Sequence, residues 1–300
     1  MTHELSARVV GSSRVLGVWG WPVSHSRSPQ MHNAAIAELQ LPYVYVPFAV
    51  SPENIRDAVS GLRALDIAGV NVTVPLKELV IPCLDWVSNE AQRVRAVNTI
   101  VNDNGYLRGY STDGQGFMLA IEDWGEDAGG RDILLLGAGG SARSVAYALV
   151  ERGTKVWVSN RTPESAVRLV DELNAWSANS ACTCDDASDG AHCTLVVNAT
   201  SAGMSPHAET MAQLPKGLLE HRPAVYDLVY APRETTLLRV AREAGCRTEN
   251  GLKMLIYQGA LALQLWTDLP FARMPVGAMY DAANRYDEPR LLNVNRQMPP

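Results

Sequence analysis

A lysine that follows an apolar segment is the first candidate for chemistry in this sequence. Residues 70–74 alternate valine with asparagine and threonine, the period of a half-buried strand, and Pro75 then removes a backbone donor and ends the strand. Lys77 follows two positions later. A lysine held in place by a strand end can supply a proton and a positive charge to an oxygen that gains an electron pair. The alternative is a solvated lysine, the usual state of a lone lysine after a strand.

A glycine-rich turn indicates a second kind of chemistry, the binding of a phosphate. The turn lies between a buried apolar segment and a helical one, and it consists of Gly137, Ala138, Gly139, Gly140, Ser141 and Ala142. In such a turn, the first glycine permits a tight bend and the second lets a pyrophosphate approach the backbone. The N-terminus of the following helix receives the phosphate charge. We therefore expect a dinucleotide site here, the alternative being a tight turn without a ligand.

The end of the next strand selects between two cofactors. An NAD site usually has an acidic residue there to hold the ribose 2′-hydroxyl, whereas a 2′-phosphate needs a cation. This chain has Asn160, Arg161 and Thr162, and no acid. The guanidinium of Arg161 can pair with a phosphate through two N–H groups, which favours NADP. The alternative is that Arg161 is a surface residue without a ligand.

Two serines, Ser26 and Ser28, stand in the turn after the first predicted strand. Hydroxyl groups at the carboxyl end of a strand lie where open α/β sheets bind ligands. Ser28 is also expected to cap a helix whose first residue is Pro29, and it can have both roles. His25 and His32 have no carboxylate partner near them in the sequence, so we interpret both as structural.

The elements that must position these residues alternate strand and helix. The first hundred residues predict a parallel α/β sheet, with strands over 15–19, 43–50 and 70–74 and helices over 28–40 and 51–65. Two short strands follow around the turn Asn104-Gly105. The alternation restarts after Asp113 and continues to Gly245, and a long helix then begins at residue 252. A chain of 300 residues is long enough for two such domains.

The composition is typical of a globular protein and excludes several classes of function. The chain is 47% hydrophobic and 19% charged, and its net charge of −6 without a lysine or arginine run predicts no nucleic-acid partner. No apolar run reaches about 18 residues, so no membrane partner is expected. The N-terminus carries no signal-peptide pattern, and we expect a cytoplasmic protein.

A cysteine-containing segment superficially resembles a metal site. Cys182, Cys184 and Cys193 lie near Asp185 and Asp186, and His192 is close by. The spacing matches no familiar zinc pattern, and the segment is polar and typical of a loop. We therefore expect no metal.

Motifs from both halves of the chain resemble the shikimate dehydrogenase family. They follow one another in the order and spacing of that family, from about Val15 to Asp281, and they read GWPVSHSRSPQMHN, NVTVPLK, AVNT, GYSTDGQG, GAGGSA, NRT, NATSAGM and GLKMLIYQ. The resemblance implies reversible NADP-dependent reduction of 3-dehydroshikimate to shikimate, a step of aromatic amino-acid biosynthesis. It also implies two domains: an α/β substrate domain over 1–113 completed by 250–288, and a Rossmann-type NADP domain over 114–249. Residues 289–300 are expected to form a loose tail, and the protein to be a monomer or a homodimer.

The resemblance also implies a role for individual residues. Lys77 and Asp113 would be the catalytic pair, and Ser26 and Ser28 would hold the substrate carboxylate. The ring hydroxyls would be bound by Thr73, Asn98, Asp113 and Gln258, with help from Thr112 and Tyr230. NADP would be bound by the glycine-rich turn, by residues 160–162, and beside the nicotinamide by Thr200, Met204, Gly251 and Met254.

The sequence departs from the family pattern at four positions. Leu76 replaces a histidine or aromatic residue, at what we interpret as a packing position, and Ser111 replaces an asparagine. Ser165 stands where a second basic residue often serves the 2′-phosphate, which weakens the argument for strict NADP preference. Lys253 replaces a small residue beside the expected nicotinamide site, and nothing in the sequence explains it.

Two alternatives remain open at this point. A quinate/shikimate or aminoshikimate dehydrogenase would use the same chemistry on a neighbouring ring, although Ser28 favours shikimate. A regulatory relative could keep the fold without the reaction. Against this, Lys77 and Asp113, which folding does not need, are both present.

Overall fold

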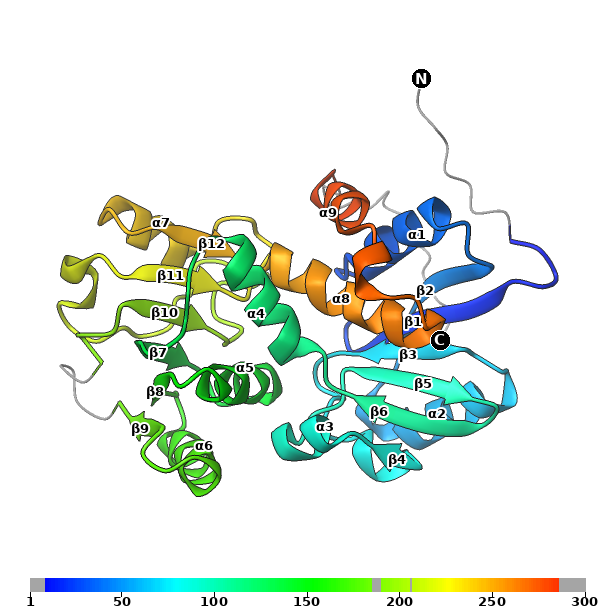
Figure 1. Cartoon of the computed structure of the whole chain (residues 1–300), viewed down its shortest axis with the longest axis horizontal. Helices are drawn as coiled ribbons and strands as arrows, with labels where there is room; N and C mark the ends of the chain where they lie inside the picture. The colour runs from blue at the N-terminus through cyan, green and yellow to red at the C-terminus, as the bar shows by residue number, and fades with distance from the viewer. Residues whose placement is uncertain (1–8, 185–189, 206, 286–300) are drawn as a thin grey trace, which may run out of the picture.

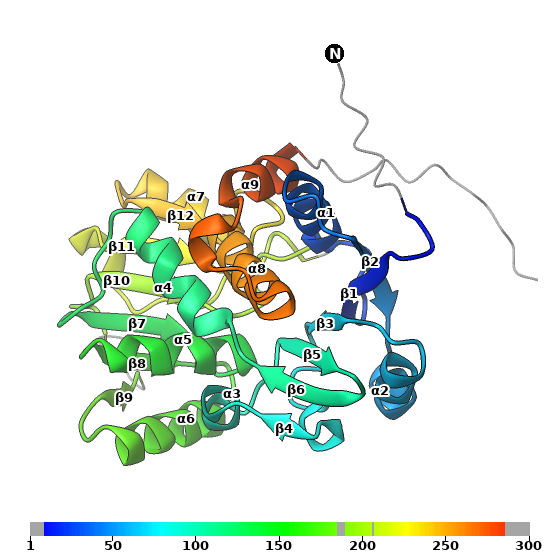
Figure 2. The ribbon, with the colours of Figure 1, turned by 45° about the vertical axis from the view of Figure 1, so that its right-hand side comes forward.

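Two sheets and the two helices between them organise the molecule. The computed structural model describes residues 9–184, 190–205 and 207–285, so the tail predicted at 289–300 lies outside the described residues. Each six-stranded sheet forms the centre of one lobe, and helices α4 (Asp113–Asp123) and α8 (Leu252–Thr267) run between the lobes (Figures 1 and 2). The α/β class and the two-domain architecture are therefore confirmed.

The first sheet has the strand order β2-β1-β3-β5-β6-β4. Its strands are β1 (Arg14–Gly20), β2 (Tyr43–Ala49), β3 (Gly69–Val72), β4 (Trp86–Val87), β5 (Thr99–Asp103) and β6 (Tyr106–Tyr110). The prediction of a parallel sheet holds for β2, β1 and β3 but not for the whole, since β5 runs antiparallel to both β3 and β6. The reason is that β5 and β6 form a hairpin, which cannot place two neighbouring strands in parallel.

The strand before Lys77 differs from its prediction in length and in burial. Strand β3 ends at Val72, and all four of its residues are buried, whereas Val74 is 66% exposed. The predicted half-buried strand to residue 74 is therefore wrong. Strand β3 lies between β1 and β5, so both of its edges are paired, and its pairing with β1 stops at the Trp19–Val72 pair.

Helices cover the first sheet and complete its core. They are α1 (Ser28–Glu38), α2 (Ile55–Ala64, preceded by a 3-10 turn over Pro52–Asn54), α3 (Asn89–Val94) and α9 (Val276–Arg285). Leu16, Met31 and Ala260 belong to one buried cluster, which joins β1 and α1 to the C-terminal helix α8. Helix α8 thus returns to the first lobe, and α9 lies beside α1 (Figure 2).

The second sheet is parallel throughout, with the order β12-β11-β10-β7-β8-β9. Its strands are β7 (Asp132–Leu136), β8 (Lys155–Ser159), β9 (Ala181–Thr183), β10 (Leu195–Asn198), β11 (Ala224–Asp227) and β12 (Thr248–Asn250). The helices of this lobe are α5 (Gly140–Glu151), α6 (Pro163–Trp176) and α7 (Thr236–Glu243). Residues 181–183, predicted as loop, form an edge strand because β8 offers them a free edge to pair with.

Helices α4 and α8 approach each other closely at Gly116. A Cβ atom at this position would lie 2.7 Å from both Cβ and the backbone nitrogen of Gln258. Only a glycine permits this distance. The contact sets the register between the first turn of α4, which carries Asp113, and the middle of α8. Within the described part of the chain, no helix is long and apolar enough to cross a membrane.

Candidate active site

A cleft of about 170 Å3 opens between the two lobes, and residues of both line it. The strand ends of β1 and β3, the N-terminus of α4, the glycine-rich turn and α8 all contribute to its wall. It brings together half of the predicted site residues, namely Ser26, Ser28, Thr73, Lys77, Asn98, Asp113, Ser141, Tyr230, Gly251, Met254 and Gln258. Residues far apart in the sequence are thus neighbours at this one place.

Lys77 and Asp113 form an ion pair in the cleft. Lys77 Nζ lies 2.5 Å from Asp113 Oδ2, and the two side chains are only 13% and 7% exposed. Lys77 also donates a hydrogen bond of 3.0 Å to Ser141 Oγ. Hydrogen bonds between charged groups are short and strong, and partial burial protects them from screening by salt. The ammonium group is therefore held at a defined point of the wall, with one of its three N–H groups left for a ligand.

Asn98 connects the catalytic candidates to helix α8. Its side-chain nitrogen, which has two N–H groups, lies within hydrogen-bond distance of three acceptors: Asp113 Oδ1 at 2.7 Å, Thr112 Oγ1 at 2.9 Å and Gln258 Oε1 at 3.3 Å. Thr112 in turn donates to the backbone carbonyl of Gln258 at 3.0 Å. Thr112 lies behind the cleft wall and is buried, so it supports Asn98 and Gln258 and does not line the cleft.

The two serines lie at the start of α1, but not as predicted. Ser28 is the first residue of the helix, and Arg27 stands in the capping position without a side-chain capping bond. The prediction of Ser28 as N-cap is therefore wrong. Ser26 supplies the local interaction instead, because its hydroxyl accepts a hydrogen bond of 3.2 Å from the backbone N–H of Ser28. Both serines face the cleft.

The two histidines near the cleft differ from each other. His25 lies on the cleft wall. His32 is fully buried and stacks on Tyr45 with ring centroids 4.2 Å apart, and burial lowers the pKa of its imidazole to about 3. His32 is thus a neutral ring in the core, which fits the structural interpretation.

Asn71 is a cleft residue that the sequence reasoning missed. It lines the cleft from the buried strand β3, and Tyr45 donates a hydrogen bond of 2.7 Å to its Oδ1 atom. Its amide group donates to Thr99 Oγ1 at 3.1 Å. The signal that could have found Asn71 is a polar residue inside a strand that is buried on both faces.

The glycine-rich turn has space for a dinucleotide. Gly137 has a φ of +113°, a conformation that other residues rarely adopt, and a Cβ there would lie 3.1 Å from the carbonyl oxygen of Ala199. A Cβ at Gly139 would meet no atom within 4 Å, so the backbone is open on the side from which a pyrophosphate would approach. Ala142 is fully buried, which keeps α5 close to the sheet. These residues fit the group that the sequence predicts.

Residues 160–162 form an exposed turn between β8 and α6. Asn160 donates a hydrogen bond of 2.9 Å to the carbonyl oxygen of Thr162. Arg161 is exposed and forms no hydrogen bond or ion pair with any residue that the structure describes, so its guanidinium is available to an anion. Ser165 stands where a basic residue was expected, and its hydroxyl accepts a hydrogen bond of 2.8 Å from Arg168. The sequence reasoning missed this second cation because it lies three residues further along the helix.

The remaining cofactor candidates are placed differently from one another. Thr200 lies beside the glycine-rich turn, since its methyl group would be 3.2 Å from a Cβ at Gly137. Met254 and Gly251 line the cleft, and a Cβ at Gly251 would collide with the carbonyl of Leu228 at 1.9 Å. Met204 is 37% exposed and does not line the cleft, so the structure does not bring it to the other site residues.

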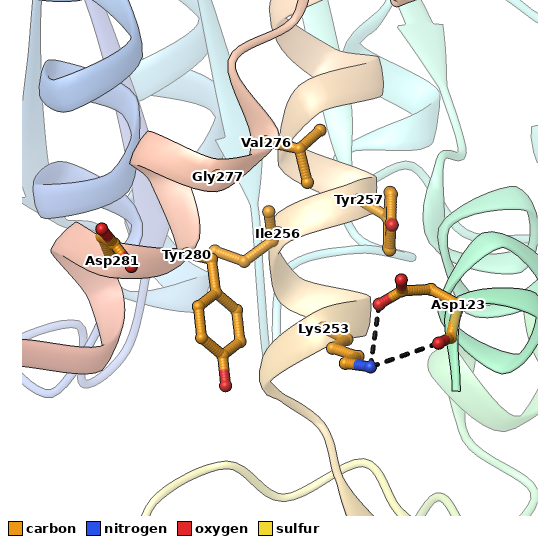
Figure 3. A pocket seen from close by; sticks show the side chains of 8 residues that line it. All are labelled: Asp123, Lys253, Ile256, Tyr257, Val276, Gly277, Tyr280 and Asp281. Atoms are coloured by element: carbon orange, nitrogen blue, oxygen red, sulfur yellow. Dashed lines mark hydrogen bonds and ion pairs between the residues drawn. The ribbon is translucent and has the colours of Figure 1, made fainter. Parts of the chain in front are cut away.

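Lys253, unexplained in the sequence, belongs to a second cavity. This cavity of about 270 Å3 lies between α4, α8 and α9 (Figure 3). Lys253 Nζ lies 2.8 Å from Asp123 Oδ2 and 3.8 Å from Glu249 Oε2. The side chain thus points away from the cleft and links the C-terminal end of α4 to the first turn of α8.

Two other departures from the family pattern have physical explanations. Leu76 is completely buried in the core of the first lobe, which confirms a packing role. Ser111 is buried, and its hydroxyl lies 3.3 Å from that of Ser144 on α5, a polar contact between the lobes.

The cysteine-containing segment is only partly described. Asp185 and Asp186 lie outside the described residues, and His192 pairs with Asp132 at 2.8 Å.

Family models match most of the chain. The model described as "Shikimate dehydrogenase substrate binding domain" matches residues 18–100. "Shikimate / quinate 5-dehydrogenase" matches residues 119–221, and "Shikimate 5'-dehydrogenase C-terminal domain" matches residues 251–283. The three matches fall in the first lobe, in the second lobe and in the returning helices.

Relatives of known identity resemble the chain over nearly its whole length. The shikimate dehydrogenase (NADP(+)) of Symbiobacterium thermophilum is 45% identical, over 91% of this chain and 94% of that protein. The structure of shikimate 5-dehydrogenase from Thermus thermophilus in complex with NADP(H) and shikimate has a TM-score of 0.82 at 40% identity, over 91% and 99% of the two chains. Quinate dehydrogenase from Corynebacterium glutamicum in complex with NAD has a TM-score of 0.80 at 33% identity, over 90% and 98%.

Proposed function

Because the chain belongs to the shikimate dehydrogenase family and acts as an NADP-dependent oxidoreductase, we propose that Lys77 and Asp113 interconvert 3-dehydroshikimate and shikimate. The observation that carries this assignment is the ion pair of 2.5 Å in a cleft that both lobes line. Reduction of a carbonyl group leaves negative charge on its oxygen. A cation between the substrate lobe and the dinucleotide turn can stabilise that charge.

The chemistry assigned to the pair is a proton transfer. NADPH, when bound, would supply a hydride for the ketone carbon; the π electrons of the C=O bond would then move to the oxygen, which would require a proton. Lys77 would donate this proton through the N–H group that is not engaged by Asp113 or Ser141. In the oxidation direction, the neutral amine would take the proton from the substrate hydroxyl. Asp113 would orient the ammonium group and accept a hydrogen bond from a neighbouring ring hydroxyl.

The other cleft residues would bind the substrate and hold it still. Ser26 and Ser28 would bind its carboxylate, and its hydroxyls would be bound by Thr73, Asn98 and Gln258, with Tyr230. Support comes from their common position on the cleft wall and from the Asn98 network that links Asp113 to Gln258. A site that pairs each ring hydroxyl discriminates strongly against a ring that lacks one.

We assign the cofactor to the second lobe. The open backbone at Gly139 supports pyrophosphate binding there, and the free guanidinium of Arg161 supports binding of the 2′-phosphate. We propose a substrate domain over 1–113 completed by 250–288, and a cofactor domain over 114–249. The partners would be small molecules and not nucleic acid, and the protein would act in the cytoplasm as a monomer or homodimer.

Quinate remains the second candidate substrate, because a quinate dehydrogenase has nearly the same fold. Steady-state rates with shikimate, quinate and aminoshikimate, each with NADP and with NAD, test the proposal. The expected result is the highest kcat/KM for shikimate with NADP. A higher value for quinate or aminoshikimate would correct the substrate, and no turnover of any of the three would contradict the enzymatic role.

A further inference from the structure

Ser141 touches both members of the proposed catalytic pair. Its hydroxyl accepts a hydrogen bond of 3.0 Å from Lys77 Nζ and donates one of 3.5 Å to Asp113 Oδ2. The sequence predicts for this residue only a place in the phosphate-binding turn. Its side chain lines the cleft, as does that of Lys77. The glycine-rich turn therefore contributes a hydroxyl group to the catalytic end of the site as well as backbone N–H groups to the cofactor.

The position of Ser141 relative to Lys77 is set by contacts between the lobes. Arg143, two residues further along α5, donates a hydrogen bond of 2.8 Å to the carbonyl oxygen of Val94 and forms an ion pair with Glu172. A Cβ at Gly114 would lie 2.7 Å from the carbonyl oxygen of Ser144, so α4 and α5 are in direct contact beside Asp113. The first turn of α5 is thus fixed against the segment that carries the carboxylate.

The geometry of the ammonium group explains what the hydroxyl adds. A lysine side chain has four carbon–carbon bonds to rotate about and three N–H donors. One acceptor, Asp113, leaves the ammonium free to turn about that single hydrogen bond. A second acceptor at Ser141 fixes two N–H groups and so directs the third into the cleft. Directing a donor at the place where charge develops is a main source of rate enhancement.

We propose that Ser141 is a positioning residue of the reaction, which aims the third N–H group of Lys77 at the substrate oxygen. The proposal rests on the roles assigned to Lys77 and Asp113. Because the same residue belongs to the dinucleotide turn, it also connects the cofactor lobe to the proton donor. This role differs from phosphate binding, which would affect the affinity for NADPH and not the chemical step.

Ser141→Ala and Ser141→Thr test the proposal in the full-length enzyme, with Ser60→Ala on the exposed face of α2 as the control. The rate of hydride transfer is measured in a single turnover, because product release can hide the chemical step in kcat. The dissociation constant of NADPH is measured separately. Ser141→Ala is expected to slow hydride transfer about tenfold or more, the scale of a hydrogen bond to a charged group. The NADPH dissociation constant should change less, and Ser141→Thr, which keeps a hydroxyl, should recover most of the rate.

Two outcomes would overturn the proposal. One is a normal hydride-transfer rate in Ser141→Ala, and the other is a weakened NADPH affinity with an unchanged rate, which assigns the hydroxyl to the phosphate alone. Lys77→Ala, measured in parallel, separates this proposal from the assignment it rests on. If Lys77→Ala is inactive and Ser141→Ala is normal, only the role of Ser141 fails. If Lys77→Ala keeps its rate, both fail.

Discussion

Asn98 donates a hydrogen bond of 2.7 Å to Oδ1 of Asp113, whose other oxygen, Oδ2, lies 2.5 Å from the ammonium group of Lys77. The two oxygens of this carboxylate therefore have different partners, and the carboxylate cannot rotate without breaking one of the bonds. Asn98 also contacts Gln258, so the orientation of the proposed catalytic pair depends on helix α8 of the C-terminal segment. The chain must return to its first lobe before this site is complete.

Lys77→Ala should lower kcat about 10²- to 10⁴-fold, the usual range for a positioned acid or base. The KM for shikimate should change little by comparison, because the serines and Gln258 still contact the ring. Steady-state kinetics in both directions measure this. Lys216→Ala, which removes an exposed lysine, is the control. A Lys77→Ala enzyme with nearly normal kcat would mean that Lys77 forms a structural ion pair with Asp113 and does not transfer the proton.

Several motifs of the candidate site can be recognised from local sequence. The glycine-rich turn, the Asn160-Arg161-Thr162 turn and the cleft serines are each recognisable from a few adjacent residues. The end of β3 was missed because local alternation continues to Val74, whereas the strand ends where its pairing with β1 stops at Val72. The end of β3 therefore depends on the neighbouring strand, and the residues of the segment alone do not determine it.

Contacts between distant segments could not be predicted from the residues alone. Lys253 pairs with Asp123, which lies on another helix 130 residues away, and the rules for charge pairs within one helix do not reach such a partner. The Lys77–Asp113 pair was expected only through the family resemblance, since nothing in either local motif specifies a distance of 2.5 Å. The contact of the Ser141 hydroxyl with this pair could not be predicted from either motif.

Arg161→Ala should raise the KM for NADP far more than the KM for NAD. The guanidinium is exposed and unpaired within the described chain, so its removal takes a partner from the 2′-phosphate and disturbs nothing else. The kcat with saturating NADP should stay close to that of the wild type, because the loss is one of binding. Arg168→Ala, measured beside it, shows whether the cation at the Ser165 position shares this role. Equal or higher kcat/KM with NAD in the wild-type enzyme would contradict the NADP assignment at this residue.

Replacing Ser26 and Ser28 together by alanine should raise the KM for shikimate and leave the affinity for NADPH nearly unchanged. Both hydroxyls line the cleft, on the lobe opposite the glycine-rich turn. Thermal unfolding is measured on the same protein, because Ser26 also accepts the backbone N–H of Ser28 at the start of α1. A double variant that binds shikimate normally but melts several degrees lower would mean that the hydroxyls stabilise the helix start and do not bind the substrate.

The buried imidazole of His32 should make the stability of the protein depend on pH. Burial lowers the pKa of His32 to about 3 from its ordinary value of 6.5, so the folded state keeps the ring neutral while the unfolded state takes up a proton. The stabilisation that results is complete above pH 6.5 and is lost as the pH falls from 6.5 towards 3. Between pH 7 and pH 5 this single group should lower the free energy of unfolding by about 2 kcal/mol.

Urea unfolding at pH 7 and pH 5 measures this effect when the wild type is compared with His32→Phe. Phenylalanine keeps a ring that can stack on Tyr45 but has no proton to bind, so the variant should lose less stability over this interval. His221→Gln removes an exposed histidine and should retain the wild-type dependence. The comparison uses the change with pH and not the stability itself, so a small packing defect in the variant does not obscure it. If His32→Phe lost as much stability as the wild type between the two pH values, protonation of His32 would not be coupled to unfolding.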